Sequence, residues 1–134
     1  MQFHRGRLID HVHLVVRDLA ASRRFYEAAL ASVGRAITFE GPGFFASDEL
    51  FVSPGDGISH VHLAFQAADR ETVHRFHAAA LAAGGRDNGG PGERSYHPGY
   101  YGAFVLDPDG NNIEAVHHGP AERSAESVVL TAEV

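Results

Sequence analysis

The stretch "DHVHLVV" at residues 10–16 decides the fold, because it returns as "SHVHLAF" at residues 59–65 with the letters HVHL unchanged. Both copies alternate apolar and other side chains, a period of two that predicts a β-strand. The apolar members of each copy share one face, which we expect to receive a helix. The histidines of each copy share the other face, so each strand presents imidazoles to solvent or to a cavity.

A helix-like pattern follows each copy. One begins at Asp18, a residue type typical of helix N-caps, and ends at Gly34; the other begins at Asp69 and ends at Gly84. Short strand-like segments come next, at residues 43–47 and 49–53 in the first half and at residues 100–107 and 111–118 in the second. The last two are joined by the turn signal "PDGN".

Each half therefore reads as a strand, a helix and two or three further strands. Chance similarity in an alanine-rich chain is the alternative, but the strand, cap, aromatic residue and glycine recur in order, which favours duplication. One half cannot cover its own sheet, so two must pair, within the chain or between chains. We expect a single domain over residues 1–119, with modules at about 7–55 and 56–119, and a tail over residues 120–134.

Composition limits the function classes. The chain has 134 residues, 44% of them hydrophobic, as expected for one globular domain. The absence of cysteine excludes disulfides and thiolate metal sites. A net charge of -6 with scattered arginines argues against a nucleic-acid partner. No apolar run long enough for a membrane span or a signal peptide occurs, so we expect a cytoplasmic protein that does not contact membranes.

The histidine-bearing strands suggest a metal site. Glu114, in the last predicted strand, can join imidazoles from the two duplicated strands. Two neutral imidazoles and one carboxylate would hold a divalent cation and leave positions open for substrate. For any single histidine, an exposed surface position is the favoured interpretation. For the whole set we favour the metal.

The segment at residues 84–104 contains seven glycines and two prolines, which predicts a loop. Loops on rigid scaffolds often carry binding residues. Here the candidates are Arg94, Tyr96, His97, Tyr100 and Tyr101. His97 is a candidate proton shuttle, the tyrosines could contact an oxygenated substrate, and Arg94 could bind a carboxylate. Ordinary packing is the alternative, and for Tyr101 we favour it.

These motifs resemble the vicinal oxygen chelate superfamily, which includes glyoxalase I, fosfomycin-resistance thiol transferases, bleomycin-binding proteins and extradiol dioxygenases. The resemblance covers residues 8–118 and rests on "DHVHLVVRDLAASRRFYEAAL", "SHVHLAF" and "FVLDPDGNNIEAV". It implies an α+β fold of two βαβββ modules that form an incomplete mixed β-barrel around a divalent metal ion, usually in a homodimer.

The resemblance also implies a ligand set of His11, His60 and Glu114 for one divalent ion of Fe, Mn, Zn, Ni or Co. His13 and His62 would then contact substrate or support the ligands. Glyoxalase I-like members take a fourth carboxylate ligand from the last strand of the first module. This chain has Phe51 there, a candidate substrate contact, and Glu49 lies two residues earlier as a possible substitute.

The family members differ in chemistry. Fosfomycin transferases have threonine where this chain has His13 and use a lysine, whereas this chain has none. Extradiol dioxygenases match at His97 and Glu114 but expect a tyrosine where this chain has Phe104.

We therefore expect a metal-dependent lyase, isomerase or extradiol-type dioxygenase that acts on a small substrate chelated through vicinal oxygens. The expected catalytic residues are His97, His13 and Tyr100, and the expected substrate contacts are His62, Arg94, Tyr96, Tyr101 and Phe51. The alternative is a non-catalytic drug-binding protein of bleomycin-resistance type.

Overall fold

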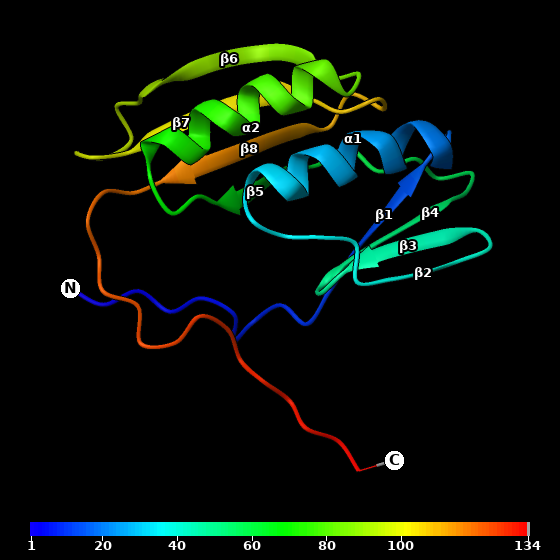
Figure 1. Ribbon diagram of the computed structural model, residues 1–134, viewed down its shortest axis with the longest axis horizontal. Coiled ribbons are helices and arrows are strands. Elements are labelled where there is room, and N and C mark those ends of the chain that lie inside the picture. The colour runs from blue at the N-terminus through cyan, green and yellow to red at the C-terminus, as the bar shows by residue number, and fades with distance from the viewer. Residues whose placement is uncertain (134) are drawn as a thin grey trace.

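Two copies of a βαβββ unit make up the computed structural model, which describes residues 1–133 (Figure 1). The first unit consists of β1 (Val12–Val16), α1 (Leu19–Ser32), β2 (Phe39–Gly41), β3 (Phe44–Ser47) and β4 (Leu50–Pro54). The second consists of β5 (His62–Gln66), α2 (Arg70–Ala82), β6 (Arg86–Glu93), β7 (Tyr101–Leu106) and β8 (Asn112–His117). The duplication predicted from the sequence is confirmed.

Each unit forms its own four-stranded mixed sheet. The strand order is β1-β4-β3-β2 in the first sheet and β5-β8-β7-β6 in the second. The first strand of each unit pairs in parallel with the last one, and the other pairs are antiparallel. The α+β fold with paired modules is confirmed, and the two sheets do not close into a barrel.

Each helix begins where the sequence predicts. The Asp18 carboxylate accepts a hydrogen bond from the Ala21 amide, and the Asp69 carboxylate accepts one from the Thr72 amide, at 3.1 and 2.7 Å. These bonds satisfy amides that a helix N-terminus otherwise leaves unpaired. Gly34, with a φ of 80°, follows the end of α1 in the left-handed conformation that ends many helices.

The core lies between each sheet and its helix. Leu14, Val16 and Val52 of the first sheet are fully buried, as are Phe25 and Tyr26 of α1. The two helices contact each other and lie side by side near the middle of the molecule (Figure 1). The opposite face of each sheet is left open within the chain, and this face carries the polar and aromatic side chains considered below.

The loop predicted at residues 84–104 is wrong for residues 86–93, which form β6 and pair with β7. Backbone pairing does not need side chains, and the register shifts around Gly89 and Gly92 accommodate this glycine-rich strand. Residues 94–100 form the loop between β6 and β7. In the first unit, the first of the three strands after the helix is β2, whose residues the sequence patterns did not mark as a strand.

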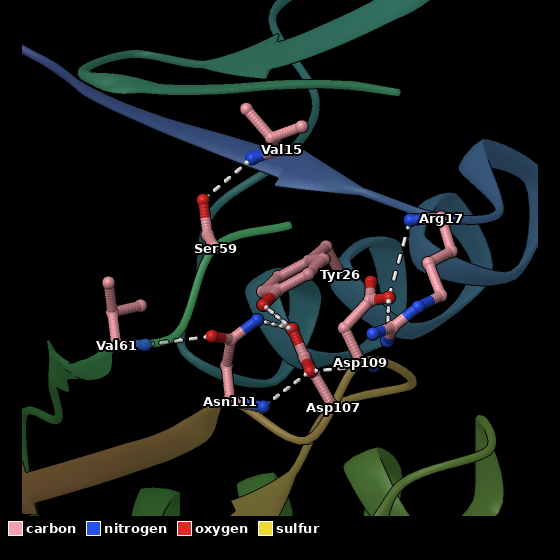
Figure 2. Close-up of polar contacts among 8 residues, drawn as sticks. All are labelled: Val15, Arg17, Tyr26, Ser59, Val61, Asp107, Asp109 and Asn111. Atoms are coloured by element: carbon pink, nitrogen blue, oxygen red, sulfur yellow. Dashed lines mark hydrogen bonds and ion pairs between the residues drawn. The ribbon is translucent and has the colours of Figure 1, made fainter. Parts of the chain in front are cut away.

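A buried polar network joins the two units (Figure 2). The Tyr26 hydroxyl of α1 donates to Asp107, and both oxygens of this carboxylate accept further bonds from residues 109 and 111. Burial and the nearby Asp107 raise the pKa of Tyr26, which therefore stays protonated. Asn111 is fully buried, and its Oδ1 accepts from the Val61 amide at 2.8 Å. The "PDGN" turn thereby fixes the start of β5 as well as that of β8.

Two further contacts secure the same junction. Ser59 and Val15 exchange two hydrogen bonds, Ser59 N to Val15 O at 3.0 Å and Val15 N to Ser59 Oγ at 2.9 Å. The Arg17 guanidinium lies 3.2 Å from the Asp109 carboxylate (Figure 2). The segment that precedes β5 is therefore held from both units. In the described residues, 1–133, neither helix is both long and apolar enough to cross a membrane.

Candidate functional site

Glu114 is the centre of the candidate site. It lies on β8, where Ile113 and Ala115 point to the buried helix side and Glu114 points to the open face of the second sheet. The carboxylate is only 1% exposed. The Nε2–H of His62 donates to its Oε1 at 2.7 Å, and the Tyr100 hydroxyl donates to its Oε2. A buried carboxylate costs free energy unless it is paired in this way.

The Tyr100 hydroxyl is fixed as a hydrogen-bond donor. Burial and the hydrogen bond to Glu114 raise the pKa of Tyr100 well above that of a free phenol. Gly102 makes the room for this pair, because a Cβ there would lie 3.0 Å from Glu114 Oε2 and 3.3 Å from the Tyr100 ring.

Other predicted residues surround this pair on the open face. The Phe104 ring lies 5.9 Å from that of His62, and the Arg94 guanidinium lies 5.2 Å from the Phe104 centroid. Tyr101 points elsewhere, since its hydroxyl bonds to His74 of α2 at 2.6 Å. Arg94 thus belongs to the surroundings of Glu114, and Tyr101 belongs to the helix side of the sheet.

The loop at residues 94–100 adds further rings. Tyr96 and His97 contact the edge of the Tyr100 ring, with centroid distances of 4.9 and 5.3 Å. His97 Nε2 also lies 2.9 Å from Nδ1 of His118, at the end of β8. The sequence patterns did not predict this pairing of His97 with His118.

The open face of the first sheet is different in character. His13 Nε2 bonds to Ser53 Oγ at 2.7 Å. Beside His13 runs a row of aromatic rings, one from each remaining strand, with successive centroids 5.0 to 5.4 Å apart: Phe51, Phe44 and Phe39. The Phe44 ring lies over Gly41, where a Cβ would come within 2.8 Å of it. Phe51 is thus part of an aromatic row, and His13 stands at its polar end.

The three predicted metal ligands do not lie together in one chain. His11 bonds to its neighbour Asp10 at 2.6 Å in the first unit. His60 is exposed in the segment before β5, and no hydrogen bond to its ring occurs in the described part of the chain. Glu49, the possible fourth ligand, is also exposed. Within residues 1–133, no three or more His, Cys, Asp or Glu side chains gather in a way that could hold a metal ion.

His62, rather than His60, is the histidine that contacts Glu114. A signal for this was present in the sequence, since His62 stands seven residues before the cap Asp69, as His11 stands seven before Asp18 (69 − 62 and 18 − 11). Matching the letters HVHL instead aligned His11 with His60. Two extra residues between the second strand and its helix account for the difference.

The fold and the site together define a protein of paired βαβββ modules with open sheet faces, one of which carries a buried carboxylate. The sequence model of the Glyoxalase/Bleomycin resistance protein/Dioxygenase superfamily matches residues 8–115, and the chain belongs to this superfamily. The resemblance inferred from the sequence is confirmed.

Solved structures agree with this assignment. The chain is 32% identical to a glyoxalase/bleomycin resistance protein from Albidiferax ferrireducens, with a TM-score of 0.71 and coverage of 82% of this chain and 98% of that one. A glyoxalase/bleomycin resistance protein/dioxygenase family enzyme from Burkholderia phytofirmans is 23% identical, with a TM-score of 0.64 and coverages of 81% and 97%. A glyoxalase-related enzyme from Fulvimarina pelagi is 22% identical, with a TM-score of 0.65 and coverages of 89% and 99%. The last two matches support the fold alone. No curated protein matches the chain.

Proposed function

We propose that the protein is a divalent-metal-dependent enzyme of glyoxalase or dioxygenase type that acts on a small oxygenated substrate. The observation that carries the proposal is the buried Glu114 carboxylate, paired with the His62 imidazole on an open sheet face. Imidazole and carboxylate are the ligand types that catalytic Zn, Fe, Mn, Ni and Co sites use. A cation would take the place of the proton that these two groups share in the metal-free protein.

The donor set of one chain supplies two ligands, and we propose that a homodimer completes it. His11 is exposed beside the open face of the first sheet, at the position equivalent to His62 when both are counted from the helix caps. If the first module of a second copy covers the second module of this chain, His11 of that copy could supply the third ligand. His60 remains the alternative ligand from the second module.

When bound, the metal would act as a Lewis acid on the chelated substrate oxygens. The chain's own residues supply the rest of the chemistry. Tyr100 donates a hydrogen bond to one oxygen of Glu114, and Arg94 and Tyr96, which lie near Phe104 and Tyr100, are the candidates to bind polar groups of a substrate. His97 and His13 are the candidates for moving a proton at substrate carbon or oxygen. Tyr101 is not among the candidate substrate contacts, because its hydroxyl is bonded to His74 of α2.

Metal content tests the proposed metal site and distinguishes His62 from His60 as its ligand. We would measure it by plasma mass spectrometry on tag-free protein, beside His62→Ala and the matched control His60→Ala. We expect about one metal ion per chain in the wild type and in His60→Ala, and loss of the metal in His62→Ala. The opposite pattern would return the ligand role to His60. No metal in any protein after soaking would contradict the proposal.

The aromatic row on the first sheet favours a second candidate, a drug-binding protein without catalysis. Phe39 is 67% exposed and Phe44 and Phe51 are half-buried, so planar rings could stack on this face. Such a binder should hold an aromatic ligand unchanged, with the same affinity after chelator treatment. An enzyme of the proposed type should lose activity under the same treatment.

A further inference from the structure

The loop at residues 94–100 lies directly on the chain that leaves β8. Gly99 has a φ of 89°, and a Cβ there would lie 3.1 Å from the carbonyl oxygen of His118. Only glycine combines this backbone conformation with so close an approach. The Arg94 amide donates to the Tyr100 carbonyl at 3.0 Å, and the Tyr100 amide donates to the His97 carbonyl at 3.1 Å. The loop is thus closed on itself and pressed against residues 118–119.

A side-chain hydrogen bond ties the loop to His118, the residue that follows β8. His97 Nε2 and His118 Nδ1 lie 2.9 Å apart, and the two ring planes differ by only 19°. His97 Nδ1 lies 2.8 Å from the Pro98 carbonyl, which can only accept, so this nitrogen carries a proton. In a neutral His97, Nε2 is then the acceptor, and Nδ1–H of His118 is the donor. The bond needs one of the two facing nitrogens to be without a proton.

The same two imidazoles enclose Tyr100. Their rings meet the Tyr100 ring edge-on, at centroid distances of 5.3 Å for His97 and 5.2 Å for His118, and Tyr96 closes a third side. Within residues 1–133, the Tyr100 hydroxyl makes one hydrogen bond, which it donates to Glu114 Oε2. The position of this phenol on Glu114 therefore depends on where the histidine pair holds the loop.

We propose that His97 and His118 form a clip that positions Tyr100 on Glu114, and that the clip opens when both imidazoles carry a proton. His97 and His118 are thus positioning residues in this role. One added proton leaves an N–H···N bond intact, whereas two protons place two N–H groups against each other at 2.9 Å. The clip does not depend on a metal, but its consequence for Glu114 as a ligand rests on the proposed function.

Most of the groups that face the pair disfavour a second proton on it. Burial, the facing His97 and then Arg5 of the N-terminal segment lower the pKa of His118, with a smaller contribution from His117, while Glu114 opposes them. The uncharged Tyr96 and Tyr100 are the other titratable neighbours. At neutral pH the pair is therefore closed.

Nuclear magnetic resonance tests the clip in chelator-treated protein, so that failure of metal binding cannot affect the result. In protein with ¹⁵N-labelled histidine, we expect a through-hydrogen-bond ¹⁵N–¹⁵N coupling between His97 and His118 at neutral pH. With 3-fluorotyrosine at the four tyrosines, Tyr100→Phe assigns the ¹⁹F signal of Tyr100. We expect loss of the coupling and a shift of this signal to occur together as the pH falls from about 7 to 5.

Three variants distinguish positioning from general stability. In His118→Phe, which keeps a ring but no donor, the Tyr100 signal should be shifted at every pH. In His118→Gln, whose amide can donate to His97 and does not titrate, the signal should stay near that of the wild type and lose most of its acid transition. His74→Gln, a control on α2, should leave both the Tyr100 signal and its acid transition unchanged. His97→Phe repeats the test if His118→Phe does not fold. Absence of the coupling at neutral pH, or a Tyr100 signal that neither His118→Phe nor His97→Phe moves, would overturn the proposal.

Discussion

The two modules share one backbone plan but carry opposite kinds of side chain on their open faces. In the first sheet, His13 pairs with Phe51, in an aromatic row. At the equivalent register of the second sheet, Ala64 pairs with Glu114, within a cluster of ionisable groups. Both positions lie five residues before their helix caps, Asp18 and Asp69 (18 − 13 and 69 − 64).

The helix-covered faces did not diverge in this way. Leu14 and Val16 of β1 are fully buried against α1, and the buried residues of the second unit, such as Val73, Phe76 and Ile113, are equally apolar. Core positions must remain apolar because each exchange for a polar group would cost packing and desolvation free energy. The open faces carry no such constraint, so after duplication they were free to acquire different chemistry.

We expect the largest effect from removal of the negative charge of Glu114, which distinguishes the open face of the second sheet from that of the first. Glu114→Gln keeps the shape of the side chain, but its amide cannot serve as an anionic ligand. We expect Co²⁺ binding, followed by calorimetric titration, to weaken by more than about 100-fold, beyond what loss of a supporting contact costs. Phe51→Leu, the matched change at the equivalent position, should leave Co²⁺ affinity within error. Equal effects at the two positions would mean that the modules are not divided in this way.

The next comparison contrasts the two faces of the first sheet. Phe45 is buried against α1, whereas Phe51 on the neighbouring strand lies half-buried on the open face. Phe45→Ala should lower the free energy of unfolding by about 3–5 kcal/mol. At protein concentrations below those at which the proposed homodimer forms, Phe51→Ala should lower it by only about 1 kcal/mol, because less apolar surface is removed from contact. Urea denaturation measures both. A large loss for Phe51→Ala would show that its face is covered in solution, as the proposed homodimer requires.

The hydrogen-bond network of residues 107–111 is a further difference between the two modules. Residues 107–111 connect β7 to β8 and bond to both units, whereas β3 and β4 are connected by Asp48 and Glu49 alone. Asn111→Ala would remove the hydrogen bond to the partly buried Val61 amide and one bond to the Asp107 carboxylate. We expect a loss of about 2–3 kcal/mol in unfolding free energy. Asn112→Ala, at a half-exposed neighbour, should cost less than about 1 kcal/mol. Similar losses for the two would contradict a joining role for the turn.

The fold was predictable because its signals are local and occur twice. The caps Asp18 and Asp69, the alternation in the first strands and the "PDGN" turn each mark an element by residues that are neighbours in sequence. Strand β6 was missed for the opposite reason. Its glycines carry no face pattern, and only pairing with β7 makes the segment a strand.

The site was predictable in part. Its strand position singles out Glu114, which is buried and hydrogen-bonded to His62, while its role as a metal ligand stays a prediction. The identification of His62 as the partner of Glu114 depended on two residues inserted before α2, and comparison of the repeated letters HVHL could not place this insertion. The contact of His97 with His118 depends on how the loop turns back after β6, and no local pattern encodes that return.

The smallest expected effect concerns pH and belongs to the second module alone. Because the pKa of His118 is lower in the folded chain than its ordinary 6.5, the folded state binds fewer protons than the unfolded state just below that pH. The contribution of His118 to stability is therefore complete above pH 6.5 and is lost as the pH falls below it. Urea denaturation across this range should show a shallower decline for His118→Gln than for the wild type. A decline as steep in His118→Gln as in the wild type would mean that the pH response does not come from the paired imidazoles of the second module.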